Sequence, residues 1–195
     1  MKRICLAVVV FALAGCQTQQ QGAVLMPVAP AVSPQQPAPP IAAAVSAGPL
    51  TRAAVETYMD AQESDLRSYL RGQGVLVARR GDGLLVNIPN DKLFDKMELT
   101  AWGNAVITSV SQVFAHYDHS AVEVDAYTDS TGTDQENLSL SQKRAKIVSD
   151  ALAQKGVAPA RLTASGLGAT NPKVTDTRDP RNRRIELKIT PTPSG

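Results

Sequence analysis

The sequence contains little cysteine, and this limits the ways in which the chain can be stabilised. Only Cys5 and Cys16 occur among the 195 residues, and Cys5 lies in a segment typical of a cleavable leader. After cleavage one cysteine would remain, so no disulfide can form within the mature chain. The fold must depend on a hydrophobic core, which a segment of about 145 residues is long enough to bury.

An excess of one charge is also absent. The formal net charge is +2, from 20 basic and 18 acidic residues, and Lys2 and Arg3 of the leader account for the difference. The mature chain is therefore neutral and has no overall basic field that would attract nucleic acid. A charged ligand would have to be held by a few local side chains.

Patterns that carry catalysis are missing as well. The two histidines, His116 and His119, are three residues apart and have no further ligands at metal-binding spacing. Ser165 lacks the glycine two residues before it that a nucleophile elbow requires, and no glycine pattern indicates nucleotide binding. We therefore expect no catalytic residue, no metal and no cofactor, and we expect that the chain is not an enzyme.

The first 16 residues have the features of a bacterial lipoprotein leader. Two positive charges precede an apolar run over 4–14, which is too short to span a membrane but typical of a signal peptide. Residues 13–16, LAGC, are similar to a lipobox, in which the cysteine becomes acylated. We expect residues 1–15 to be removed and Cys16 to carry acyl chains, palmitate among them, that anchor it to a membrane. The alternative is an ordinary signal peptide with an incidental cysteine.

The segment after Cys16 indicates where the chain is anchored and how far it reaches. Gln17 stands where an aspartate would resemble an inner-membrane retention signal, which favours the outer membrane. Residues 16–49 are rich in glutamine, proline and alanine and contain no aromatic residue, so they cannot bury enough apolar surface to fold. Such a tether would reach between roughly 30 Å as a coil and roughly 100 Å when extended. A spacer without any required length is equally compatible.

Hydrophobic periodicity predicts alternating helices and strands in the remainder. The predicted elements, in order, are a helix over 51–71, a hairpin with strands 75–80 and 84–89, an irregular stretch over 89–97, a helix over 100–117, a strand over 121–127, a helix that begins near Ser139 with Gln142 as its capping-box partner, and strands over 162–168 and 183–190. This order predicts an α/β fold in which helices cover one face of a mixed sheet. Strands on either side of a crossover helix should be parallel.

The loop over 128–137 leaves a strand and enters a helix, a position where open sheets commonly bind ligands. Asp129 lies in this loop and could hold an ammonium group. Arg144 lies further along the helix, and its guanidinium fork matches a carboxylate. The two would form a clamp for a zwitterionic head group. The alternative is that Asp129 is a turn residue with which Arg144 pairs structurally.

Several spaced motifs resemble the OmpA-like peptidoglycan-binding family. The matching segments are Tyr127-Thr128-Asp129-Ser130-Thr131-Gly132, Asn137-Leu138-Ser139, Lys143-Arg144-Ala145, and Asn182-Arg183-Arg184 followed by Ile185-Glu186-Leu187. The resemblance covers about residues 84 to 190, and it includes several motifs in the right order.

The resemblance implies a βαβαβ fold that binds the peptide stem of peptidoglycan at its meso-diaminopimelate residue. It assigns the ammonium of that residue to Asp129 and the carboxylate to Arg144. Further members of the implied pocket are Asn137, Arg183, and the backbone N–H groups near Thr131 and Gly132. We expect Arg184 to be structural, because alternation places it on the opposite face from Arg183.

Two departures from the family pattern affect the rim of the implied pocket. The stretch after Phe94-Asp95 is about two residues short, which leaves any role of Asp95 open, and the loop before Asn182 is also shortened. The expected organisation is a signal peptide (1–15), a lipidated tether (16–49), a helix and hairpin extension (50–83), an OmpA-like domain (84–190) and a tail (191–195).

The sequence therefore predicts an outer-membrane lipoprotein whose domain faces the periplasm and links the membrane to peptidoglycan. The alternative is an envelope lipoprotein that uses the same fold to contact a protein partner through the helix over 51–71.

Overall fold

The computed structural model describes residues 50–192, apart from residue 52. The predicted leader, Cys16 and tether lie outside the described residues. The helices and strands are α1 (Val55–Tyr69), β1 (Leu76–Arg80), β2 (Gly83–Pro89), α2 (Asn90–Leu93), β3 (Phe94–Asp95), β4 (Glu98–Leu99), α3 (Ala101–His116), β5 (Ser120–Tyr127), α4 (Asp134–Gln154), β6 (Leu162–Gly166) and β7 (Arg184–Pro191), with 3-10 turns at Pro159–Arg161 and Pro180–Asn182. None of the described helices is long and apolar enough to cross a membrane.

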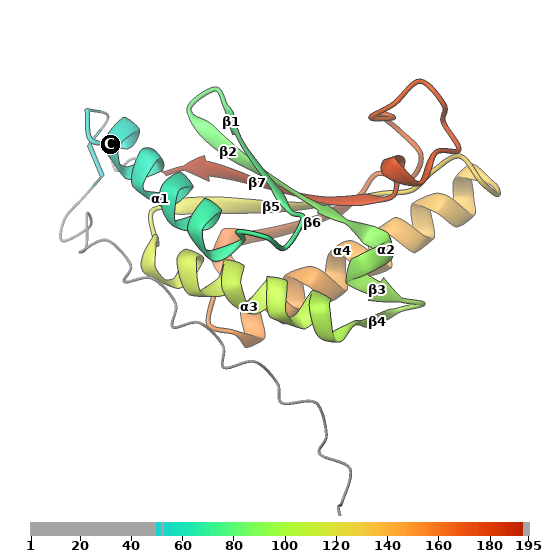
Figure 1. Ribbon diagram of the computed structural model, residues 1–195, viewed down its shortest axis with the longest axis horizontal. Coiled ribbons are helices and arrows are strands. Elements are labelled where there is room, and N and C mark those ends of the chain that lie inside the picture. Colours follow the sequence, from blue (N-terminus) through green and yellow to red (C-terminus); the bar gives the residue numbers. More distant parts are fainter. Residues whose placement is uncertain (1–49, 52, 193–195) are drawn as a thin grey trace, which may run out of the picture. The chain divides into compact units, whose positions relative to one another are not determined.

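Five strands form one mixed sheet in the order β1-β2-β7-β5-β6, and β3 and β4 form a separate two-stranded ribbon (Figure 1). The parallel pair is β5 with β6, which α4 connects, while the other neighbours in the sheet are antiparallel. The predicted α/β class and the parallel pairing across a crossover helix are confirmed. The last strand, β7, lies between β2 and β5, so residues near the C-terminus complete the centre of the sheet.

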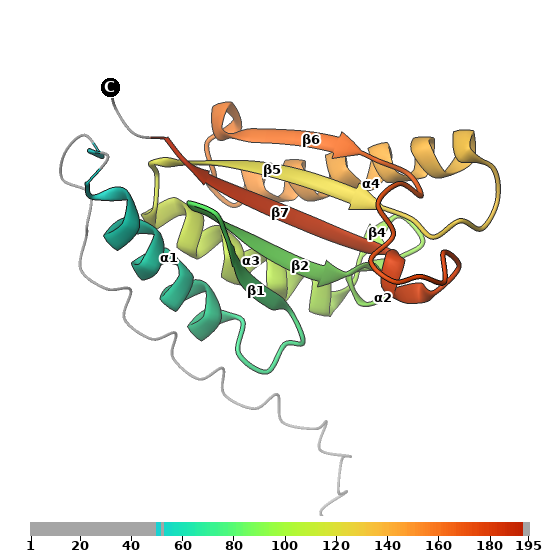
Figure 2. The ribbon, with the colours of Figure 1, turned by 90° about the horizontal axis from the view of Figure 1, so that it is seen from above.

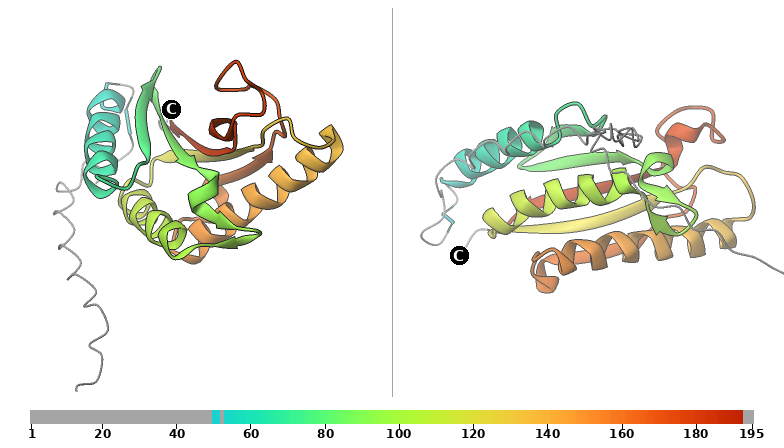
Figure 3. Two further views of the ribbon diagram at one scale, coloured as in Figure 1. Left: turned by 45° about the vertical axis from the view of Figure 1, so that its right-hand side comes forward. Right: turned by 60° about the horizontal axis from the view of Figure 1, so that its bottom comes forward.

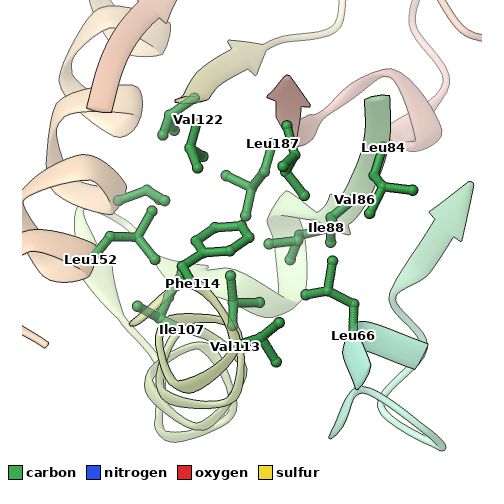
Figure 4. Close-up of a cluster of buried hydrophobic side chains, with 14 of the residues drawn as sticks. Leu66, Leu84, Val86, Ile88, Ile107, Val113, Phe114, Val122, Leu152 and Leu187 are labelled. Atoms are coloured by element: carbon green, nitrogen blue, oxygen red, sulfur yellow. The ribbon is translucent and has the colours of Figure 1, made fainter. Parts of the chain in front are cut away.

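The helices pack on one face of this sheet and bury one continuous core. In β7 the residues Ile185, Leu187 and Ile189 face the helices, while the charged residues between them face the other side. Figure 4 shows Phe114 of α3 near the centre of the apolar cluster, and Figure 3 shows α3 and α4 beneath the curved sheet. The core fixes α4 against β5 and β6, and this positions the start of the helix.

The α1 helix packs as part of this core. Tyr58, Met59 and Leu66 are fully buried, and the hydroxyl of Tyr117 at the end of α3 donates a 2.7 Å hydrogen bond to Asp65. The apolar side of α1 therefore covers its own sheet and is not available to a partner, so the packing does not favour the alternative function.

The start of α4 differs from the predicted one. The helix begins at Asp134, and Thr133 caps it: the Thr133 hydroxyl accepts from the Glu136 N–H at 3.2 Å, and the Glu136 carboxylate accepts from the Thr133 N–H at 2.9 Å. The prediction of a start near Ser139 was wrong because two capping-box patterns occur in succession. The earlier one also places two acids in the first turn, where the helix dipole favours them. Asn137 consequently lies in the helix.

Candidate functional site

Four segments from three distant parts of the sequence meet at one end of the sheet. They are the loop after β5, the first half of α4, the short helix α2 and the residue that precedes β7. Figure 2 shows the end of β5, the start of α4 and the start of β7 at the same end of the sheet, with α2 beside them. The segments carry two carboxylates and two guanidinium groups, on Asp91, Asp129, Arg144 and Arg183.

Arg183 connects the two carboxylates. Its Nε and Nη2 donate to the two oxygens of Asp91 at 2.8 and 2.5 Å, and its Nη1 donates to Oδ2 of Asp129 at 2.6 Å. The first contact is a bidentate fork, the strongest geometry for this pair of groups, and the second is a single bond. The hydrogen bonds to Asp91 and the single hydrogen bond to Asp129 together outweigh partial burial and raise the pKa of Arg183.

Asp129 is held in the charged state in a buried position. Only 6% of the residue is exposed, and its Oδ1 accepts from the backbone N–H of Thr131 at 3.0 Å. Burial by itself would raise the pKa of Asp129, but the hydrogen bonds from Arg183 and Thr131 outweigh it, so the pKa lies below the ordinary value of 3.8. The ionised group therefore stabilises the fold above its unfolded-state pKa, and this contribution is lost only as the pH falls through the lower, folded-state value.

Arg144 is the guanidinium of this site that donates no hydrogen bond to a described residue. Its side chain is partly buried beside the ring of Phe94, with 5.7 Å between the guanidinium carbon and the ring centroid, and its buried Nε has no hydrogen-bond partner among the described residues. Burial lowers the pKa of Arg144, while Asp91 and Asp129 act in the opposite direction. Buried donors are nearly always paired in proteins, so this group is suited to a ligand that brings an acceptor.

The loop between β5 and α4 is fixed by its own hydrogen bonds. The Asn137 side-chain amide donates to the Thr131 carbonyl at 3.0 Å, and Gly132 adopts a φ of 85°, which favours glycine. The Thr131 N–H points at Asp129, and the buried Thr128 hydroxyl has no hydrogen-bond partner in the described part of the chain. Asn137 thus holds the loop that presents Asp129.

The structure brings Asp129, Asn137, Arg144 and Arg183 to one end of the sheet. Sequence reasoning missed Asp91, which lies in the stretch predicted to be irregular. That stretch forms the four-residue α2, which is too short to show helical periodicity. The expected structural role of Arg184 agrees with the geometry: its guanidinium lies 3.8 Å from the Tyr127 ring centroid, on the sheet face away from the helices.

A hollow of about 660 Å³ lies elsewhere, on the sheet face that the helices leave open. Its walls include Leu76, Leu85, Arg184 and Lys188. The two cations among these are already paired, Arg184 with Glu186 at 2.7 Å and Lys188 with Asp125. The lining also includes three further cations, Arg79, Arg80 and Lys173.

Comparison with known proteins gives one family model and several relatives that match this chain. The profile described as the OmpA family matches residues 93–186. "Probable lipoprotein YiaD" of Escherichia coli (strain K12) is 41% identical over 139 residues, which cover 69% of this chain and 64% of that protein. "Peptidoglycan-binding protein ArfA" of Mycobacterium tuberculosis (strain ATCC 25618 / H37Rv) is 41% identical over 71 residues, 35% of this chain and 22% of its own length.

A solved structure gives a matching fold. The cell wall anchor of the T6SS from Pseudomonas aeruginosa aligns with a TM-score of 0.54 and 27% sequence identity, over 65% of this chain and 96% of that one. None of these three proteins is described as an enzyme in its name. The chain spans less than two thirds of the length of both curated relatives, so the resemblance concerns the shared domain.

Proposed function

We propose that the OmpA-family domain, which the family model matches over residues 93–186, binds the diaminopimelate-bearing peptide stem of peptidoglycan without catalysing a reaction. The observation that carries the proposal is the arrangement around Arg144. A partly buried guanidinium that has no hydrogen-bond partner among the described residues lies in a site that also contains two carboxylates. Such a site fits a ligand that carries both charges.

The D-centre of meso-diaminopimelate is such a ligand, because it bears a carboxylate and an ammonium on one carbon. Arg144 would donate to the carboxylate through its unused N–H groups, which suit planar, bidentate recognition. Asp129 would accept the ammonium, and Arg183 and Asn137 would fix its position. The peptidoglycan-binding description of ArfA and the cell-wall role in the description of the secretion-system anchor support the same ligand class.

We also propose that the segment before the domain anchors the chain in the outer membrane. The lipobox-like LAGC sequence and the similarity to a lipoprotein support lipidation of Cys16. With Cys16 in the outer membrane, residues 17–49 would form the tether and the domain would face the periplasm. The chain would then link the outer membrane to the cell wall by a lipid anchor at one end and a non-covalent grip at the other.

Binding to isolated sacculi tests this function. We expect the purified protein to sediment with sacculi whose stems contain diaminopimelate, and we expect Asp129→Ala to remain in the supernatant, because the variant lacks the buried carboxylate and leaves Arg183 without one of its partners. Asp95→Ala is the matched control, since Asp95 is an exposed aspartate near the site. Equal sedimentation of the wild type and Asp129→Ala would contradict the proposed site.

A further inference from the structure

We infer that Asp91 provides the net negative charge with which the site attracts the ligand's ammonium group, and that it does so by holding Arg183 away from full pairing with Asp129. The inference rests on the proposed function and deepens it. Asp91 is a positioning residue in this account, because it acts on the ligand through Arg183.

The guanidinium of Arg183 donates more hydrogen bonds to Asp91 than to Asp129. Asp91 receives two of its donors in a planar fork, at 2.8 and 2.5 Å, and Asp129 receives one, at 2.6 Å. A guanidinium is rigid and planar, so the fork on Asp91 fixes the direction of the remaining donors. Oδ1 of Asp129 is left to the single N–H of Thr131.

The formal charges explain why this division matters. Asp129 and Arg183 by themselves form a neutral pair, which offers little to a cation. Asp91 brings the three residues to a net charge of −1, and Arg144 nearby carries the balancing +1. The site therefore has one anionic and one cationic part and is neutral as a whole, as is a ligand head group with one ammonium and one carboxylate. Because Asp129 is buried, water and salt screen its interactions with other charges less than they would at the surface.

Loss of Asp91 would change both charge and geometry. Arg183 would be free to turn its fork onto Asp129 and occupy both carboxylate oxygens, the arrangement that guanidinium and carboxylate prefer. The anionic part would then be neutral and closed to an ammonium.

The sequence left open whether Asp95 contributes to the site, and in the structure the contributing carboxylate is that of Asp91. Asp95 belongs to the β3–β4 ribbon, whose two-residue turn includes Lys96 at a φ of 54°. The Asp95 side chain is exposed and makes no hydrogen bond or ion pair with any described residue. The carboxylate on this side of the site is that of Asp91.

Calorimetric titration with two synthetic ligands tests the inference. One is the soluble stem tripeptide that ends in meso-diaminopimelate, and the other is the same peptide with hydrogen in place of the ammonium at the D-centre. We expect the wild-type protein to bind the first about tenfold more tightly, the scale of one charge-assisted contact. We expect Asp91→Asn to bind the first peptide about tenfold more weakly than wild type and to bind both peptides equally.

Two further variants separate positioning from a general structural effect. Asp91→Glu should keep most of the preference for the ammonium-bearing peptide, because it restores the charge, and Asp95→Asn should behave as wild type. Circular dichroism melting shows whether each variant is folded. If Asp91→Asn kept the wild-type preference between the peptides, the role of Asp91 would be overturned while the proposed function stood. If the wild type bound neither peptide, both would be overturned.

Discussion

Replacing Arg144 with alanine is expected to weaken binding of the diaminopimelate-bearing stem peptide by about 10- to 150-fold, which corresponds to the roughly 1.5–3 kcal/mol of a hydrogen-bonded charge contact. The buried Nε of Arg144 has no hydrogen-bond partner among the described residues, so the contact that is lost is one with the ligand. For the same reason the variant should melt within a few degrees of wild type. Calorimetric titration and thermal unfolding measure the two effects separately.

Lys143 offers a matched control for this substitution. It is the preceding residue of α4 and is exposed, and it carries the same charge. Lys143→Ala should bind the stem peptide as wild type does if recognition depends on the position of Arg144. An equal loss of affinity in both variants would instead indicate unspecific attraction between the helix and an anionic ligand, and would contradict the proposed carboxylate contact.

Gly166→Ala is expected to destabilise the fold by about 3 kcal/mol or more. A Cβ atom at Gly166 would lie 2.1 Å from the backbone nitrogen of Gln142 and 2.6 Å from the carbonyl carbon of Ser141. Both are backbone atoms of α4, so relief requires the whole helix to move away from β6. Such overpacking lies at the upper end of the usual cost of about 1–3 kcal/mol. Urea unfolding followed by circular dichroism gives the free energy directly.

The same substitution should also affect ligand binding, because α4 carries Asn137 and Arg144. Thr163→Ala, at an exposed position of β6, is the control for a change of strand composition without a clash. If Gly166→Ala had the same midpoint of urea unfolding as the wild type, this would contradict the close approach of α4 to β6 at Gly166.

Much of the fold could be predicted from local patterns. The alternation of Ile185, Leu187 and Ile189 gives a strand with one apolar face, and the apolar stripe of residues 100–117 gives a helix close to the observed α3. The insertion of β7 between β2 and β5 could not be predicted in this way. Strand order depends on pairing between residues about a hundred positions apart, such as Val86 with Leu187.

The same distinction applies to the candidate site. Asp129 and Arg144 could be predicted because both belong to one strand-loop-helix unit, in which spacing determines their proximity. Asp91 could not, because its contact with Arg183 joins residues 92 positions apart. The predicted start of α4 was wrong for a local reason. Thr133-x-x-Glu136 and the later Ser139-x-x-Gln142 both satisfy the capping-box pattern, so the pattern alone does not select between them.

The most direct test of the central claim is a nuclear magnetic resonance titration of the ¹⁵N-labelled protein with the soluble stem tripeptide that ends in meso-diaminopimelate. The account predicts saturable shifts in the backbone amides of residues 128–133 and in the side-chain N–H groups of Arg144 and Arg183. The absence of shifts, or shifts confined to the open sheet face around Leu76 and Lys188, would contradict it.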